Sequence, residues 1–339
     1  MRTFTSTSGS VYPDGTSDAD SLFAGASATA VQLGEQLRRE ADLRGSPRVL
    51  LLTGPAMLRA FTDAQLEALK EDGVAIETIV IRHPGLDPAY CPMLVELDLD
   101  RPASAGAFLA ALDMAVSDWQ PQSLQNGQGH RIGAFLFSRA TSGEVAAHLA
   151  RVALQRRPRS GRCLLGLHDP AAFDGIWRVC STVQRRHVLG PVDDWYVVDR
   201  WQRCSVHRRD ESAEAAAEST VLSFSASQWD ALANVRAINR AWIQAQYEGM
   251  PVSPAIFAKL ADAMQRARSY GLFDADDLVL FAWHALSVRP DFDSHPHIRH
   301  ALQNVGPDTL YARVEASLSE RVWHEVRIGE AGGPGSREA

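Results

Sequence analysis

A histidine and an aspartate stand side by side where a strand of the first half of the chain is expected to end. His168 and Asp169 follow the apolar run 163–167 and precede Pro170. Enzymes built on an α/β sheet often place catalytic side chains at such a strand end, so one hypothesis is an α/β enzyme that uses His168 and Asp169. The alternative is that Asp169 caps a helix beginning at Pro170, because a carboxylate accepts hydrogen bonds from the free amides of a first turn. We favour the cap, since a single His-Asp pair is common by chance.

A second group of side chains combines carboxylate and imidazole groups in one short segment. Its members are Asp291, Asp293, His295, His297 and His300. Such groups are metal ligands. Pro296 suits the first turn of a helix, however, and the histidines that follow would then diverge around the helix surface. We therefore favour a solvated helix start and expect no metal site.

Two short basic clusters, Arg156-Arg157-Pro158-Arg159 and Arg185-Arg186-His187, are the remaining candidates for contacts. They are able to dock an acidic partner, but charge runs usually mark solvated faces, which is the interpretation we favour. The chain has no Gly-x-Ser-x-Gly nucleophile motif and no kinase or zinc-protease signature. We expect no catalytic residue, no cofactor and no enzymatic activity, and the sequence leaves the partner-binding residues unknown.

Composition excludes several classes of function. The formal net charge of -7 argues against binding along a nucleic-acid backbone, which requires a basic face. No apolar run approaches the roughly 20 residues that cross a bilayer, and residues 1–20 lack the features of a secretory signal. A cytoplasmic protein that contacts neither nucleic acid nor membrane is expected. The four scattered cysteines are interpreted as small apolar fillers.

Alternating strand and helix patterns occupy the first half. Strands are predicted at 49–52, 74–81, 93–97, 132–137, 163–167 and 195–201, with helices at 58–69, 104–116, 142–154 and in segments up to residue 189. Several strands are apolar on both faces, which indicates a sheet covered by helices. The predicted fold class of this half is α/β, or mixed α+β, with the strand order and direction left open.

Beyond an alanine-rich polar stretch the apolar residues repeat with a helical period, and no further strand is predicted. Ser253-Pro254 and Asp274 are typical helix starts. These patterns divide the chain into an N-terminal extension that is partly disordered (1–45), an α/β lobe (46–204), a polar linker (205–220), an all-α lobe (221–328) and a disordered tail (329–339).

The order of several short motifs resembles one known family. The motifs are Pro92 before Leu94-Val95-Glu96-Leu97, then Gly133-Ala134-Phe135-Leu136, Asp169-Pro170, Gly190-Pro191 before Trp195, and in the second half Tyr270-Gly271-Leu272, Asp276-Asp277-Leu278 and Phe292-Asp293-x-His295-Pro296. In this order they are similar to the Tap family of bacterial type VI secretion adaptor chaperones, over about residues 48–326. The chain departs from the family at Thr53, where an aspartate is frequent, and at His168, which replaces an aromatic residue.

The resemblance implies a function in binding. It implies an adaptor that binds a toxic type VI secretion effector in the cytoplasm and delivers it to the spike protein VgrG or to a PAAR tip. No residue of the family is implied to be catalytic. Two alternatives stay open at this point: an uncharacterised α/β enzyme using His168 and Asp169, and a structural secretion component that assembles with copies of itself.

Overall fold

The computed structural model describes residues 25–54, 61–126, 129–157, 161–209, 222–304, 306 and 310–329. Its first half is built on a six-stranded sheet in which all neighbouring strands are antiparallel. The order is β2 (Ala75–Thr78), β3 (Met93–Asp98), β1 (Arg48–Thr53), β4 (Ile132–Phe137), β7 (Asp194–Val198) and β8 (Cys204–Arg208). Strand β1 is central, because Leu51 pairs with Val95 on one side and with Phe135 on the other. The strands predicted at 49–52, 93–97 and 132–137 are confirmed.

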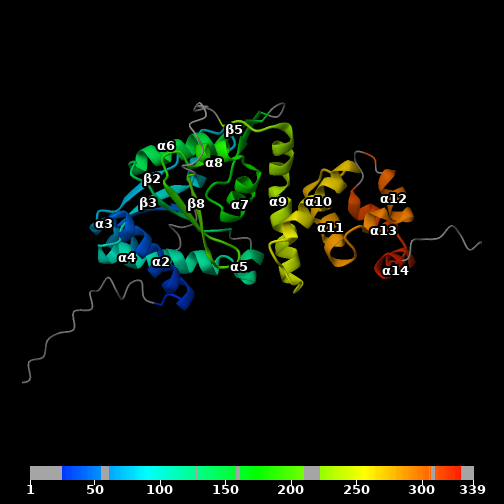
Figure 1. Ribbon diagram of the computed structural model, residues 1–339, viewed down its shortest axis with the longest axis horizontal. Coiled ribbons are helices and arrows are strands. Elements are labelled where there is room, and N and C mark those ends of the chain that lie inside the picture. Colours follow the sequence, from blue (N-terminus) through cyan, green and yellow to red (C-terminus); the bar gives the residue numbers. More distant parts are fainter. Residues whose placement is uncertain are drawn as a thin grey trace, which may run out of the picture.

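Side chains of the central strands alternate between two hydrophobic cores, as the pleat of a strand requires. Leu51 and Phe135 belong to one core, and Leu50 and Leu136 belong to the other. Helices cover both faces (Figure 1): α2 (Ala28–Arg44) and α4 (Pro102–Ser117) lie on one face, and α6 (Ser142–Ala153), α7 (Pro170–Val179) and α8 (Thr182–Leu189) lie on the other. The predicted fold class, a helix-covered sheet followed by a helical lobe, is confirmed. Shorter helices α3 (Asp63–Glu71), η2 (Pro88–Tyr90) and α5 (Pro121–Gln125) complete this half.

Helix α2 falls in the segment expected to be an N-terminal extension. Ala30, Leu33, Leu37 and Ala41 recur at helical spacing and are buried in the core against α4. Gly34 lets the two helices approach closely, because a Cβ there would lie 2.6 Å from Leu109 Cδ2. Residues 28–44 thus belong to the α/β core, whereas residues 1–24 lie outside the described part of the chain.

The strand predicted at 163–167 is wrong as a member of the main sheet. Strand β6 (Gly161–Leu164) pairs only with β5 (Leu154–Arg157), and the two form a separate hairpin. Leu165 and Leu167 are buried in the core without being in a strand, and the Leu165 amide donates to the Ala153 carbonyl at 2.7 Å. Leu165 and Leu167 are apolar because they are buried, and not because they pair in a strand. A short apolar run does not distinguish a buried strand from another buried segment.

The sheet also contains a strand that was not predicted. β8 lies at its edge, paired with β7, and covers residues that were assigned to the start of the polar linker. Its polar composition is that of an edge strand with one face toward solvent. Residues 210–220 of the expected linker lie outside the described residues.

The second lobe is helical in its described part, as predicted. Its helices are α9 (Ala226–Tyr247), α10 (Ile256–Ser269), α11 (Ala275–Ser287), α12 (Pro296–Gln303), α13 (Tyr311–Ser317) and α14 (Glu320–Ile328), with the short η3 (Phe292–Ser294). Asp274 caps α11 by accepting from the amides of Asp276 and Asp277, and Ser225 and Gln228 form a capping box that begins α9. Among the described helices, none is long and apolar enough to cross a membrane.

Helix α9 stands between the two lobes (Figure 1). It packs against α5 and α7 of the sheet lobe and against α10 and α11 of the helical lobe. Gly175 of α7 allows a close approach, because a Cβ there would lie 2.6 Å from Val235 Cγ1 of α9. The described parts of the two lobes therefore meet through packed helices.

A prediction about pH follows from His207 in β8. Its ring lies against Phe173 and Trp177, with ring centroids 5.2 Å and 4.5 Å away, and burial lowers the pKa of His207 to about 4. In the unfolded chain the His207 ring takes up a proton near pH 6.5, whereas in the folded protein it stays neutral until about pH 4. The contribution of the neutral ring to the free energy of unfolding is therefore fully present above pH 6.5 and is lost as the pH falls from 6.5 toward 4. Between pH 7 and pH 5 we expect a loss of about 2 kcal/mol in the free energy of unfolding from this group.

Urea denaturation of wild type and His207→Gln at both pH values measures this contribution. The variant is expected to lose less stability on acidification than wild type does. The same replacement at exposed His324 serves as the control and should leave the pH dependence unchanged. Equal pH dependence of His207→Gln and wild type would contradict the prediction.

Candidate protein-binding site

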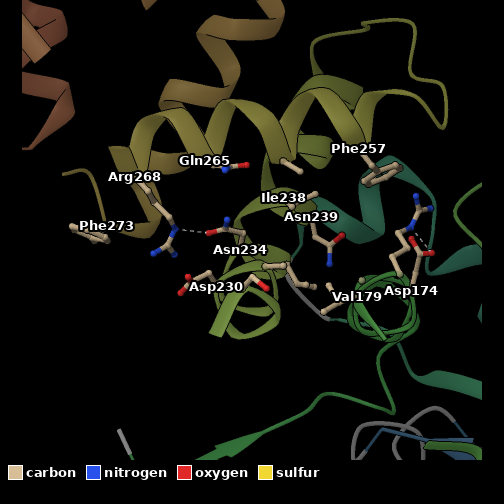
Figure 2. Close-up of a pocket in the computed structure, with 16 residues that line it drawn as sticks. Asp174, Val179, Asp230, Asn234, Ile238, Asn239, Phe257, Gln265, Arg268 and Phe273 are labelled. Atoms are coloured by element: carbon tan, nitrogen blue, oxygen red, sulfur yellow. Dashed lines mark hydrogen bonds and ion pairs between the residues drawn. The ribbon is translucent and has the colours of Figure 1, made fainter. Parts of the chain in front are cut away.

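Two grooves lie alongside the contact between α7 and α9. The first, which we call the α10 groove, is formed by α7, α9 and α10 and has a volume of about 520 Å³. Figure 2 shows its lining side chains, with Phe257 and Asp174 toward one end and Arg268 and Phe273 toward the other. Between these ends the lining is largely apolar and includes Val179 and Ile238, as well as Val235 and Ala261.

Four of the polar side chains that line the α10 groove are paired with one another. Arg268 Nε donates to Asn234 Oδ1 at 2.7 Å, and Arg178 Nε donates to Asp174 Oδ1 at 2.9 Å. Phe273 is 67% exposed beside Arg268. A large exposed aromatic ring at the end of an apolar groove is typical of a surface that contacts another protein.

The second groove, which we call the hairpin groove, lies between α9, the start of α7 and the β5–β6 hairpin, with a volume of about 480 Å³. Its apolar side chains come from all of these elements and include Leu164, Ile176, Trp229, Leu232 and Ile243. Leu164 is 38% exposed. Three arginines, Arg157, Arg236 and Arg240, line the same groove.

The two grooves use different faces of α9. Ala231, Asn234 and Ile238 line the α10 groove, whereas Leu232, Arg236, Arg240 and Ile243 line the hairpin groove. At 100° per residue these sets lie on opposite sides of the helix, and Val235 and Asn239 between them contribute to both. One helix therefore offers two separate surfaces.

Arg200 is buried beside these grooves and connects the lobes. Its Nη2 donates to Asp174 Oδ2 at 3.2 Å and to Asn239 Oδ1 at 3.3 Å. The guanidinium also lies 4.8 Å from the ring centroid of Trp242 and 4.3 Å from that of Phe257, which are favourable cation–π distances. Burial lowers the pKa of Arg200 to about 10, so the side chain stays a cation at neutral pH.

Asp169 caps α7, as the favoured interpretation predicted. Its Oδ1 accepts from the amides of Ala171 and Ala172 at 2.8 and 3.2 Å. The imidazole that approaches it is that of His130, with Nδ1 at 3.3 Å from Oδ1, and not that of His168. Burial by itself raises the pKa of Asp169, but His130 and the two amides outweigh it, so the pKa lies below its ordinary value.

His168 has a different environment from its neighbour. Burial lowers the pKa of His168, and the charge of Asp169 opposes this shift. The His168 backbone lies close to β4, because a Cβ on Gly133 would lie 2.5 Å from the His168 carbonyl oxygen. Gly133 of the Gly-x-Phe-Leu motif thus allows the backbone of β4 to approach that of His168. No local pattern predicts the His130–Asp169 pair, because its two members lie far apart in the chain.

The aspartates and histidines of the segment 291–300 do not converge. Asp293 and His295 are buried, whereas Asp291, His297 and His300 are exposed. Their contacts are Arg289 to Asp291 at 2.6 Å, Arg266 and Tyr270 to Asp293 at 3.2 Å, and Glu325 to His295 at 3.6 Å. Over the described residues, no group of three or more His, Cys, Asp or Glu side chains is placed to hold a metal ion.

The two basic clusters have different surroundings. Arg185 donates from Nε to the Trp177 carbonyl at 2.9 Å and lies over the Trp177 ring at 5.2 Å, so it has a structural contact. Arg156 and Arg157 end β5 on the hairpin, and Arg157 lines the hairpin groove. Pro158 and Arg159 lie outside the described residues.

A comparison with protein families matches the centre of the chain. Residues 83–187 match the family described as "Domain of unknown function (DUF4123)". The DUF4123 match runs from η2 to α8 and includes the hairpin and α7, which form one wall of the hairpin groove, but not α9. It lies within the region that resembles the Tap adaptors. No curated protein and no solved structure matches the chain.

Proposed function

We propose that the protein is a type VI secretion adaptor that binds an effector in the cytoplasm and loads it onto a VgrG or PAAR spike. The observation that carries the proposal is that α9, at the junction of the lobes, borders two grooves on different faces. Loading requires a protein to bind two partners at once, and the two grooves beside α9 provide a separate surface for each partner. The DUF4123 match supports the proposal, because this domain family is associated with effectors of that system.

The proposed activity is binding without turnover. The carboxylate of Asp169 is occupied by the cap of α7 and by His130, and its lowered pKa makes it a weak base. Cys163 lines the hairpin groove, as Asp169 and His130 do, but its thiol donates to the Leu164 carbonyl at 3.7 Å and not to His130. These contacts favour an adaptor over an enzyme that uses His168 and Asp169.

The first test is purification of the tagged full chain from its native host, with partners identified by mass spectrometry and the complex sized by light scattering. We expect a toxin and a spike protein in one stoichiometric complex. A monomer with neither partner would contradict the proposal. A closed ring or filament of the chain alone would instead indicate a structural component.

Blocking substitutions then assign the grooves. Ala261 in the α10 groove and Ala233 in the hairpin groove are both exposed, so a tryptophan at either position fills a groove with little effect on the core. Each of Ala261→Trp and Ala233→Trp is expected to lose one partner and keep the other. Ala258→Trp, exposed on α10 but outside the groove lining, is the control and should keep both partners.

A further inference from the structure

The hairpin groove combines an apolar lining with two arginines that lack acidic partners among the described residues. Arg157 and Arg236 make no ion pair or hydrogen bond through their side chains with any described residue. Arg240 is paired with Asp276 at 2.6 Å, beyond the groove lining. The one carboxylate in the lining, that of Asp169, already accepts from two amides and faces His130. The groove is therefore locally basic on a chain whose formal net charge is -7.

The accessible face of α9 in this groove has the spacing that receives another helix. Leu232, Arg236 and Ile243, which are half-buried or exposed, recur at intervals of four and seven residues along α9, so they form one stripe. Such a stripe offers ridges and grooves to the side chains of a helix laid along it. Apolar side chains at its two ends and an arginine between them favour a helix with apolar residues and nearby carboxylates.

We propose that the hairpin groove binds an acidic amphipathic helix of a partner protein, with Leu164, Leu232 and Ile243 contacting its apolar stripe and Arg157 and Arg236 pairing with its carboxylates. The inference rests on the proposed adaptor function, to which it adds the chemistry of one partner. A phosphate backbone fits this groove less well, because most of its lining is apolar. Recognition is of the helix-in-groove kind.

Fluorescence polarisation with labelled peptides tests the proposal on the full chain. One peptide is a helix with leucines at positions i, i+3, i+4 and i+7 flanked by glutamates, and a second peptide has lysines in place of the glutamates. We expect the acidic peptide to bind, the basic one not to bind, and the affinity to fall as NaCl is raised. The variant Arg157→Glu/Arg236→Glu should bind the acidic peptide roughly tenfold more weakly or worse.

The matched control is Arg139→Glu/Arg313→Glu, which changes the net charge equally at two exposed positions outside the groove. It should bind the acidic peptide as wild type does. Equal weakening in both double variants, failure of the acidic peptide to bind, or displacement of it by single-stranded DNA would overturn the proposal.

The same variants separate this inference from the adaptor function. If Arg157→Glu/Arg236→Glu still recovers toxin and spike from the host, the groove proposal fails while the adaptor function holds. If the acidic peptide binds in the groove but wild type recovers neither partner, the adaptor function fails while the groove specificity holds. Loss of one host partner in this variant alone supports both.

Discussion

Replacing Arg200 by alanine is expected to lower the free energy of unfolding by about 3 kcal/mol, because a large buried side chain is lost and its hydrogen-bond and aromatic partners are left behind. Arg200 is 6% exposed and contacts α7 through Asp174, α9 through Asn239 and Trp242, and α10 through Phe257. Its removal leaves a cavity between the lobes and takes a cation from Asp174. Urea denaturation followed by circular dichroism measures the loss.

Two further variants separate the causes of this effect. Arg200→Lys keeps the positive charge but loses the planar group that stacks on Trp242 and Phe257, so an intermediate loss is expected. Arg203→Ala, at a side chain that is 69% exposed, should change stability by less than about 0.5 kcal/mol. If Arg200→Ala were as stable as Arg203→Ala, Arg200 would not connect the lobes.

Replacing Gly190 by alanine is expected to cost about 3 kcal/mol or more, because two independent penalties coincide there. Gly190 ends α8 with φ 54° and ψ −117°, a backbone conformation that a side chain disfavours strongly. An added Cβ would also overlap the buried His148 ring, because it would lie only 2.1 Å from the ring nitrogen Nε2. The glycine of the Gly-Pro motif therefore has a steric reason.

Two other glycines provide matched controls for this measurement. Gly249→Ala introduces a side chain at φ 69° into open space, so it tests the backbone penalty alone and should cost about 1 kcal/mol. Gly143→Ala lies in α6 at an ordinary φ with nothing within 4 Å, so it should be neutral or stabilise by up to about 1 kcal/mol. A loss for Gly190→Ala no larger than for Gly249→Ala would refute the close contact with His148.

Local sequence patterns correctly predicted the strands and helix starts that depend on residues close together in the chain. The runs at 49–52 and 132–137 are strands because they lie at the centre of the sheet and are buried on both faces. The starts of α7 and α11 were identified from Asp169-Pro170 and from Asp274, since capping depends on residues two or three positions apart. The same logic failed at 163–167, where apolar residues enter the core outside any strand beyond Leu164.

The candidate sites depended on contacts that no local pattern contains. Arg157 was noticed as part of a basic run, but its position in a groove depends on α9, which begins about seventy residues later in the chain. Arg200 and His130 gave no signal, because an isolated arginine or histidine is usually a surface residue. Trp242 lies in the half of the chain predicted to be helical, but that prediction does not indicate that its ring borders the buried guanidinium.

The sequence by itself determined the mixed sheet and helix composition of the first half, the helical second half, the caps of α7 and α11, and a resemblance to secretion adaptors. Each of these depends on residues close together in the chain or on the order of motifs along it. Only the tertiary structure decided the antiparallel strand order, the pairing of Asp169 with His130 and the two grooves beside α9. Those features arise where distant segments pack together, and packing depends on shape complementarity in three dimensions, which local periodicity does not encode.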